Sequence, residues 1–387
     1  MNERLVGFRR ADGGFGIRNH VLIVPTVVCA NSVIERLDRG GSGEAMLTHQ
    51  HGCGQVGADL ALTRQSLYGV ATNPNVGAVV LVSLGCESNQ PDDLAELIAG
   101  TGRDVEVVGI QALGGIVAAA NFVREVAAAL RGKLDQQVRA DAGWEELVVG
   151  LECGGSDGWS GITANPALGR AADWLVSHGA TVVLGETPEI VGAERLLAAR
   201  AVSGAVQADL LRAVDDWERK ISRTGADARG GQPSPGNIAG GITTIEEKSL
   251  GAIQKGGTSP LRQVVPFGTR PTERGLVFMD TPGQDIEQLT GLASGGCQLV
   301  CFTTGRGTPT GSPVMPVIKI ATNSSVAHAM RDHIDVDAGA VLDGHATLEG
   351  VAAEIVGQIA RVCAGQLTTS EVNRQRDFAI PRLWGSL

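Results

Sequence analysis

The stretch Ala78-Val79-Val80-Leu81-Val82 decides the fold class. It is a short apolar run without the alternation of polar and apolar side chains that a half-exposed strand shows. A similar run occupies residues 21–24, and helix-like patterns follow at residues 30–37, 91–99 and 116–130. Strands buried on both faces lose the alternation, because helices cover both sides of a parallel sheet. Residues 1–135 are therefore predicted to form one doubly wound α/β domain.

The same pattern restarts after a polar linker at residues 132–143. Strand-like runs lie at residues 147–151, 180–185, 275–280, 298–302 and 317–321, and helical patterns lie at residues 166–178, 190–199 and 205–224. Residues 145–387 are predicted to form a second α/β domain, with a long loop rich in Gly and Pro near residues 226–241. The predicted architecture is two doubly wound, mostly parallel-sheet domains with an interdomain cleft.

Composition excludes several classes of partner. The chain carries 32 Lys and Arg against 42 Asp and Glu, a net charge of -10, and only 3% of its residues are aromatic. Nucleic acid and anionic membrane surfaces are therefore disfavoured. The longest apolar runs are strand-sized, too short for a membrane helix, and no secretory signal opens the chain, so we expect a cytoplasmic protein. Seven cysteines in that compartment point to metal binding, catalysis or burial, and disfavour a disulfide framework.

Three cysteines lie at the predicted carboxyl ends of strands, where open parallel sheets bind ligands. Cys53 stands beside His49 and His51, while Cys86 and Cys153 follow strands at residues 77–83 and 147–151. We expect these thiols to converge on the interdomain cleft. Thiolates with imidazole suit zinc, ferrous iron or a three-cysteine iron–sulfur cluster, although burial as small apolar residues is the alternative. A fourth thiol, Cys29, is expected to be buried at a helix start.

Acid, base and anion-binding candidates come from similar positions. Glu186 follows a strand and is either a helix-capping acid or a catalytic group, and Asp157 either caps a helix or holds a substrate hydroxyl. Arg306 lies in a loop of hydroxyls and glycines after Thr303 and Thr304, which is typical of carboxylate binding. Neither a P-loop nor a dinucleotide fingerprint is present, so nucleotide binding is disfavoured.

Motifs along nearly the whole chain resemble the altronate/galactarate dehydratase family, with the strongest likeness to its altronate dehydratases. The motifs are GGFGIRNH at 13–20, HGCG at 51–54, LGCE at 84–87, ECGGSD at 152–157, SGITANP at 160–166, GETPE at 185–189, PSPGN at 233–237 and TTGRG at 303–307. The resemblance implies a hydro-lyase that dehydrates a sugar acid, an aldonate or aldarate, to a 2-keto-3-deoxy acid with ferrous iron.

The resemblance also implies a partner. Family enzymes carry a small N-terminal SAF domain ahead of the matching region, whereas this chain begins almost at the match. In some members that domain is a separate subunit, so we expect a small SAF-domain subunit, and we also expect a homo-oligomer.

The mechanism implied by the resemblance is abstraction of the α-proton followed by metal-assisted loss of the β-hydroxyl. The residues predicted for the metal are Cys53, Cys86, Cys153 and His49. The general base is left open among His51, Glu186 and Lys248. The residues predicted for the substrate are Arg306, Thr303 and Thr304 at its carboxylate and Asp157 and Asn165 at its hydroxyls.

Two alternatives accompany this prediction. One is the large subunit of a sulfolactate sulfo-lyase type of C–S lyase, which would release sulfite in place of water. The resemblance implies that sulfo-lyase large subunits lack the thiols matching Cys53 and Cys86, so the presence of both thiols here favours the dehydratase. The other is a non-catalytic scaffold subunit, against which the density of polar groups at strand ends argues.

Overall fold

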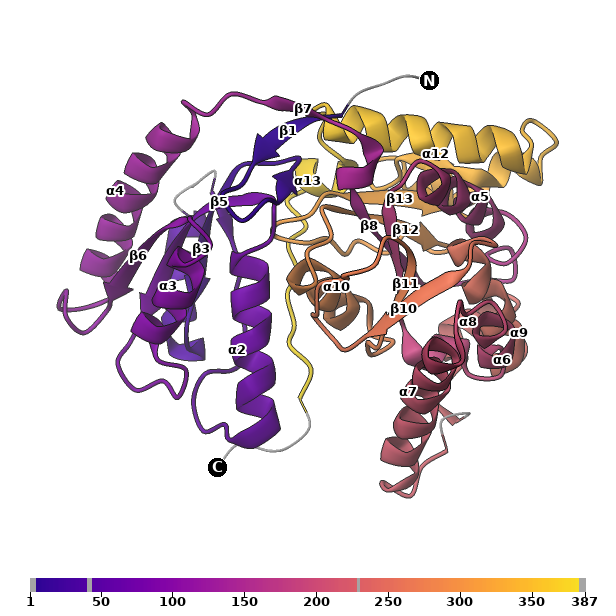
Figure 1. The fold of residues 1–387 in the computed structure, drawn as a ribbon, viewed down its shortest axis with the longest axis horizontal. Helices are drawn as coiled ribbons and strands as arrows, with labels where there is room; N and C mark the ends of the chain where they lie inside the picture. Colours follow the sequence, from indigo (N-terminus) through magenta and orange to yellow (C-terminus); the bar gives the residue numbers. More distant parts are fainter. Residues whose placement is uncertain (1–4, 40–43, 228–229, 383–387) are drawn as a thin grey trace.

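Two parallel sheets, each covered by helices on both faces, lie side by side in the molecule (Figure 1). The computed structural model describes residues 5–39, 44–227 and 230–382. The predicted α/β class with two mostly parallel sheets is confirmed. A small antiparallel sheet, which the sequence did not indicate, is added at the junction between the two domains.

The first domain is built on a four-stranded parallel sheet of order β4-β3-β5-β6. Its strands are β3 (His20–Pro25), β4 (Ala45–Met46), β5 (Val76–Ser83) and β6 (Asp104–Gly109). Its helices are α1 (Asn31–Arg39), α2 (Gly57–Ala71), α3 (Pro91–Ala99) and α4 (Ile116–Leu134). In β5, Ala78 and Val80 pack against α1 and α4, whereas Val79 and Leu81 pack against α2 and α3. Both faces of the strand are buried, which explains its unbroken apolar run.

The second domain is built on a seven-stranded parallel sheet of order β10-β11-β9-β8-β12-β13-β14. Its strands are β8 (Val148–Gly154), β9 (Thr181–Leu184), β10 (Leu261–Val265), β11 (Gly275–Met279), β12 (Leu299–Thr304), β13 (Val317–Ala321) and β14 (Val336–Asp337). The apolar face of α5 and α12 packs on one side of this sheet, and α10 packs on the other.

The helices of the second domain vary widely in length. They are α5 (Ala164–Ser177), α6 (Glu194–Ala198), α7 (Gly204–Ser222), α8 (Pro235–Ala239), α9 (Ile245–Ala252), α10 (Asp285–Ser294), α11 (Ser324–Ala329), α12 (Leu348–Cys363) and α13 (Thr369–Val372). The short 3-10 turns are η1 (Val28–Ala30), η2 (Trp144–Glu146), η3 (Thr187–Ile190), η5 (Ile253–Gly256) and η6 (Ala338–Val341). Helix α8 lies inside the loop predicted near residues 226–241, of which residues 228–229 lie outside the described part. Within the described ranges, no helix has the length and apolar character needed to cross a membrane.

The small antiparallel sheet has the order β2-β1-β7, with β1 (Leu5–Arg9), β2 (Phe15–Gly16) and β7 (Ala140–Ala142). Strand β7 lies within the polar segment predicted to be a linker. The connection between the domains is therefore paired to β1, which Figure 1 shows at the top of the junction.

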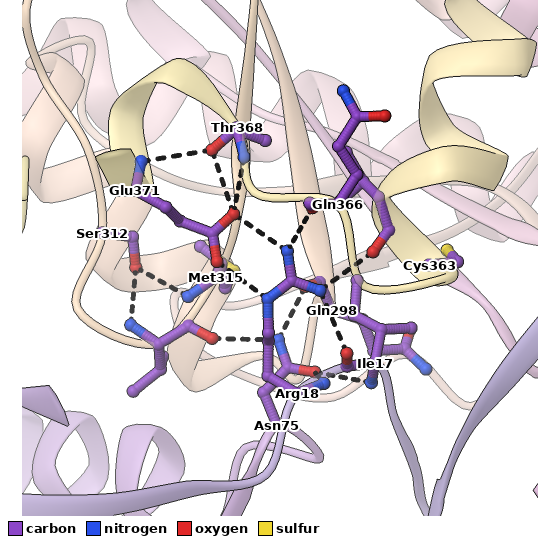
Figure 2. Close-up of polar contacts among 12 residues, drawn as sticks. Ile17, Arg18, Asn75, Gln298, Ser312, Met315, Cys363, Gln366, Thr368 and Glu371 are labelled. Atoms are coloured by element: carbon purple, nitrogen blue, oxygen red, sulfur yellow. Dashed lines mark hydrogen bonds and ion pairs between the residues drawn. The ribbon is translucent and has the colours of Figure 1, made fainter. Parts of the chain in front are cut away.

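The two domains share buried contacts. Helix α2 of the first domain packs on α10 of the second, and one buried apolar cluster contains residues of both. Figure 2 shows a polar clamp at the same junction, in which Arg18 pairs with Glu371 through Nε–Oε1 at 2.8 Å and Nη2–Oε2 at 2.9 Å. The guanidinium also donates to the carbonyls of Val362 and Gln366, at 2.9 and 2.8 Å. These contacts fix the first domain to the C-terminal part of the chain.

Each parallel sheet has one point at which its strand order reverses. In the first sheet the chain moves outward in both directions from β3 and β5, and in the second it does so from β8 and β12. Loops leave such neighbouring strands in opposite directions, and the crevice between them at the carboxyl ends is where open α/β sheets bind ligands. The fold therefore offers two binding edges.

Candidate active site

The edge of the second sheet brings together residues from β8 and the turn after β9. Cys153 is the penultimate residue of β8, and Glu186 lies two residues beyond the end of β9, the neighbouring strand. Glu186 has a φ of 66°, in the left-handed region, and its backbone N–H donates to Thr281 Oγ1 at 2.7 Å. Such a backbone costs roughly 1–3 kcal/mol in a non-glycine residue and concentrates at functional sites. The left-handed turn at Glu186 leads into η3, and this turn places Glu189 next to Cys153.

These residues form a cluster with two lysines, which we call the buried acid–base cluster. Its members are Cys153, Glu186, Glu189, Lys248 and Lys255, with exposures of 2, 0, 4, 8 and 1%. The Cys153 thiol donates to Glu189 Oε2 at 3.1 Å and accepts from Lys255 Nζ at 2.8 Å. Lys255 also pairs with Glu186, and Lys248 Nζ pairs with Glu189 Oε1 at 2.6 Å. Each charged group thus has an oppositely charged partner inside a buried site.

Burial sets the protonation of the cluster. It raises the pKa of Glu186 to about 7, with Glu189 adding to the effect, and it raises the pKa of the Cys153 thiol well above its ordinary value. Burial opposes the charged form of both lysines, yet the acidic groups around them hold the pKa of Lys255 and of Lys248 above the ordinary value. Near neutral pH the lysines are charged, the thiol is protonated and Glu186 is poised between its two states.

The cluster could hold a metal ion. One ligand atom each from Cys153, Glu186 and Glu189 lies within 4.8 Å of the others. The Oε1 atom of Glu186 is buried and has no hydrogen-bond partner, so it is an open ligand atom. Sulfur with carboxylate oxygen suits a divalent transition metal. The donor set therefore fits such an ion.

Three further charged residues lie beside the cluster, and sequence reasoning missed all three. Burial raises the pKa of Glu152 well above its ordinary value, raises that of Asp285 to about 6, and lowers that of Lys319 to about 7. Lys319 has no exposed surface, and its Nζ lies 3.5 Å from the centroid of the Phe302 ring. The sequence did offer one signal for a functional residue here: Lys319 lies inside the apolar strand predicted at residues 317–321. Burying an unpaired charge is costly, so a lysine in such a strand needs a reason.

Two cavities flank Lys248. A cavity of about 250 Å³ is lined by Lys248 together with Asp157 and Asn165. The Nζ atom of Lys248 donates to Gln232 Oε1 at 2.7 Å, and Gln232 lines a larger cavity of about 1000 Å³. Lys248 thus connects the buried cluster with space for a small molecule.

Most of the residues predicted for the substrate lie at this same edge. Thr303 pairs with Cys153 in register across β12 and β8, and its hydroxyl donates to Asn165 Oδ1 at 2.7 Å. Thr304 Oγ1 accepts from the backbone N–H of Gly307 at 3.0 Å and shapes the loop that follows β12. The structure therefore places Thr303, Thr304 and Asn165 beside one another, with hydrogen bonds made inside the protein.

Asp157 and Arg306 lie at the surface side of the edge. They share the lining of a hollow of about 370 Å³. The Asp157 carboxylate accepts from Ser160 Oγ at 3.0 Å and from Thr322 Oγ1 at 2.8 Å, so it organises the loops after β8 and β13. The exposed guanidinium of Arg306 donates to the Gly236 carbonyl at 2.7 Å.

The remaining predicted residues lie in the first domain, at the edge of the other sheet. Cys53 and Cys86 are exposed, whereas Cys153 is buried among Glu186, Glu189 and Lys255. Among the described residues, the ligand atoms grouped within 4.8 Å of Cys153 belong to Glu186 and Glu189, and neither Cys53 nor Cys86 is in that group. The reason is topological, because each sheet has its own carboxyl edge. Cys29 is also exposed, and the expectation that it is buried was wrong.

The two histidines brace the loops of the first domain. His49 Nε2 donates to the Pro25 carbonyl at 2.7 Å, and its Nδ1 accepts from the backbone N–H of His51 at 3.1 Å. His51 Nε2 donates to the carbonyl of Ile380 at 2.9 Å, and its buried Nδ1 has no partner. Among the three predicted bases, the structure thus brings together Glu186 and Lys248 in one cluster and leaves His51 apart from them.

A doubly wound fold with a buried acid–base cluster at the carboxyl edge of its sheet is typical of an α/β enzyme. Comparison with known families agrees. A family model described as "D-galactarate/Altronate dehydratase, C-terminal" matches residues 144–386, and one described as "D-galactarate dehydratase/Altronate hydrolase, second domain" matches residues 7–135. The chain belongs to the altronate/galactarate dehydratase family.

Similar proteins cover most of the chain. Altronate dehydratase of Bacillus subtilis is 38% identical over 98% of this chain and 78% of its own length. Galactarate dehydratase (L-threo-forming) of Escherichia coli is 35% identical over 94% of this chain and 73% of its own length. The (2R)-sulfolactate sulfo-lyase subunit beta of Chromohalobacter salexigens is 36% identical over 98% of both chains. The chain is therefore an enzyme of the lyase class, a hydro-lyase by family, which disfavours the scaffold-subunit alternative.

Proposed function

We propose that the protein dehydrates a sugar acid, an aldonate or aldarate of the altronate type, to a 2-keto-3-deoxy acid. The observation that carries the proposal is the buried acid–base cluster beside the cavity lined by Lys248, Asp157 and Asn165. The names of the altronate and galactarate dehydratases support the substrate class. The reaction needs a base for the α-proton, an acid for the departing hydroxyl and positive charge for the carboxylate, and the cluster contains groups of each kind.

Glu186 is the proposed base. Its Oε1 atom has no hydrogen-bond partner, and a pKa near 7 lets it accept a proton from carbon and return it. Lys248 is the proposed acid, because Glu189 keeps it protonated while it lines the cavity. Its charge also stabilises the negative charge that builds on the substrate carboxylate as the α-proton leaves. His51 is a weaker candidate, because it lies outside this cluster.

The proposed cofactor is a ferrous ion at the Cys153 group, where Cys153 and Glu189 would hold it and Glu186 Oε1 would stay free to act as the base. When bound, such an ion supplies Lewis acidity towards the β-hydroxyl, an effect worth several kcal/mol. In the described structure Lys255 bonds to Cys153 Sγ, and Lys248 pairs with Glu189 Oε1. We therefore expect metal affinity to rise with pH, because a thiol proton must leave for the metal to bind.

The proposed substrate contacts lie around the two smaller hollows. Arg306 is exposed at the rim, and its planar guanidinium suits a carboxylate. Asp157 and Asn165 line the cavity beside Lys248, where they suit the hydroxyls of a polyol chain. Thr303 and Thr304 support these contacts through the loop after β12.

A C–S lyase acting on a sulfolactate-like substrate is the second candidate. The observation in its favour is that the chain matches the sulfo-lyase beta subunit over 98% of both lengths. That relative is named as one subunit, so we also propose a small partner subunit of the SAF type for this chain. Free thiols throughout agree with a cytoplasmic enzyme, which is the proposed location.

The test is turnover of altronate and galactarate by the full chain, with ferrous iron and the partner subunit supplied. Lys248→Met should lower the formation of keto acid by about 100- to 10,000-fold, the usual contribution of general acid–base catalysis. Lys220→Met, at an exposed position of α7, is the matched control and should leave turnover unchanged. Equal turnover by both variants would refute the assigned role of Lys248.

A further inference from the structure

Three exposed thiols meet at the carboxyl edge of the first sheet. Cys29 follows β3, Cys53 follows β4 and Cys86 follows β5. Strands β3, β4 and β5 are neighbours, and the strand order of this sheet reverses between β3 and β5. The thiols thus lie at the carboxyl edge of the first sheet, as the buried acid–base cluster lies at the carboxyl edge of the second. We call Cys29, Cys53 and Cys86 the three-thiol site.

The three loops that carry the thiols are bonded to one another. The joining bonds are Val28 N–H to the His51 carbonyl at 2.8 Å, Ser88 N–H to the Gly52 carbonyl at 2.8 Å, and Thr26 Oγ1 to Glu87 Oε1 at 2.8 Å. Each loop is therefore tied to both others within three residues of its thiol. The site is built by the fold and does not depend on a chance approach of mobile side chains.

Gly52 makes this arrangement possible. Its φ is 102°, and a Cβ at this position would lie 2.4 Å from the carbonyl oxygen of Thr26. Only glycine accepts both the left-handed backbone and the close approach of the two loops. Desolvation raises the pKa of the Cys86 thiol, and the neighbouring Cys53 and Cys29 raise it further, so the three sulfurs lie near enough to act on one another.

We propose that the three-thiol site binds an iron–sulfur cluster through Cys29, Cys53 and Cys86, with one iron left open. Thiolates are the ligands that iron–sulfur clusters use, and three of them leave one iron of a four-iron cluster free for an outside ligand. The solvent exposure of the thiols provides access to that iron. This proposal concerns a different edge from the dehydratase site and stands without it.

Spacing favours a cluster over a single ion. Three thiolates around one tetrahedral ion, with metal–sulfur distances of about 2.3 Å, lie about 3.8 Å from one another. In the part of the chain that the structure covers, the Cys153 group alone has three ligand atoms within 4.8 Å of one another, so the three thiols are spaced more widely. His49 offers no substitute ligand, since both its ring nitrogens hold hydrogen bonds.

The test is anaerobic reconstitution of the full chain with iron and sulfide, followed by iron and acid-labile sulfide analysis and electron paramagnetic resonance of the reduced protein. We expect about four iron and four sulfide per chain, the content of one four-iron cluster. An iron ion at the Cys153 group would bring no sulfide, so the sulfide count reports the three-thiol site. Sulfide binding therefore tests this proposal whether or not the chain dehydrates a sugar acid.

Variants assign the site. Cys29→Ala, Cys53→Ala and Cys86→Ala should each lose most of the sulfide. Cys153→Ala, in the acid–base cluster, and Cys297→Ala, at a buried thiol of the apolar core, should retain it. Because the three thiols are exposed, we expect these variants to fold, and far-ultraviolet circular dichroism checks this. Alkylation of the reconstituted wild type gives a second readout: the three thiols should be protected until the cluster is removed. Retention of sulfide by the Cys29→Ala variant, or absence of bound sulfide from the reconstituted wild type, would overturn the proposal.

Discussion

The Nζ atom of Lys255 lies 2.8 Å from the Sγ atom of Cys153, and the same ammonium pairs with the carboxylate of Glu186. The three side chains come from η5, β8 and the turn after β9. Lys255 therefore supplies the positive charge that lets a carboxylate exist beside a thiol in a site with at most 2% exposure for all three residues. Removing that charge is the most direct perturbation of the cluster.

Lys255→Met should be strongly destabilising, because it leaves Glu186 buried without a counter-charge. Breaking a buried ion pair by removing one partner costs about 3–5 kcal/mol. The free energy of unfolding, measured by denaturant titration, should fall by that amount, whereas Lys220→Met should change it by less than about 0.5 kcal/mol. A loss below about 1 kcal/mol for Lys255→Met would mean that the pair is not buried in solution.

Glu186 should give the pH–rate profile its acidic limb. A base must be ionised to act, and the raised pKa of about 7 predicts that kcat/KM rises as the pH increases through 7. The Glu186→Gln variant should lose this acidic limb, and its rate should fall by about 100- to 10,000-fold. The Glu273→Gln variant, at an exposed position, should keep the limb and the wild-type rate. An unchanged limb in Glu186→Gln would assign the titration to another group.

Lys319 should make stability rise with pH in the alkaline range. Burial lowers its pKa in the folded protein to about 7, whereas the unfolded chain has the ordinary value of 10.5. Between these values the unfolded state binds more protons, so the free energy of unfolding increases with pH. Relative to Lys319→Met, the wild type should gain stability from pH 7 to pH 10. A difference between the two proteins that does not change over this range would contradict the burial of a neutral lysine.

Arg18 should hold the two domains together. Its side chain is 8% exposed and makes paired bonds to Glu371, while Arg9 pairs with Glu146 at 46% and 28% exposure. Arg18→Met should lower the free energy of unfolding by about 3–5 kcal/mol, because Glu371 and three backbone carbonyls lose a donor. Arg9→Met should cost less than about 1 kcal/mol. Equal effects in urea titration would show that the clamp adds nothing beyond a surface pair.

The sequence predicted the sheets well, because strands that are buried on both faces consist of unbroken apolar runs. Strand β13 (Val317–Ala321) was predicted with its observed bounds, and β5 (Val76–Ser83) within one residue. Strand β7 escaped notice because it is short and lies in a polar segment. Pairing with β1, and not hydrophobic periodicity, makes it a strand.

The site was predicted less completely, because the residues of one strand end give no information on which sheet edge they share. Cys153, Cys53 and Cys86 carry the same kind of motif, yet they belong to two separate edges. Lys255 gave no local signal, since only the fold brings η5 beside β8. Glu189 lay inside the motif quoted for Glu186, and its role follows from the left-handed turn at Glu186.

The most direct test of the proposed dehydration is the mass spectrum of the product formed from altronate and galactarate in heavy water, with ferrous iron and the partner subunit supplied. Loss of the α-proton and the β-hydroxyl gives an enol, which takes up one proton from solvent at C3 as it becomes the keto acid. We therefore predict a product that has lost one water and carries one deuterium at C3. Absence of this product from every aldonate and aldarate tried, together with sulfite release from sulfolactate, would contradict the account.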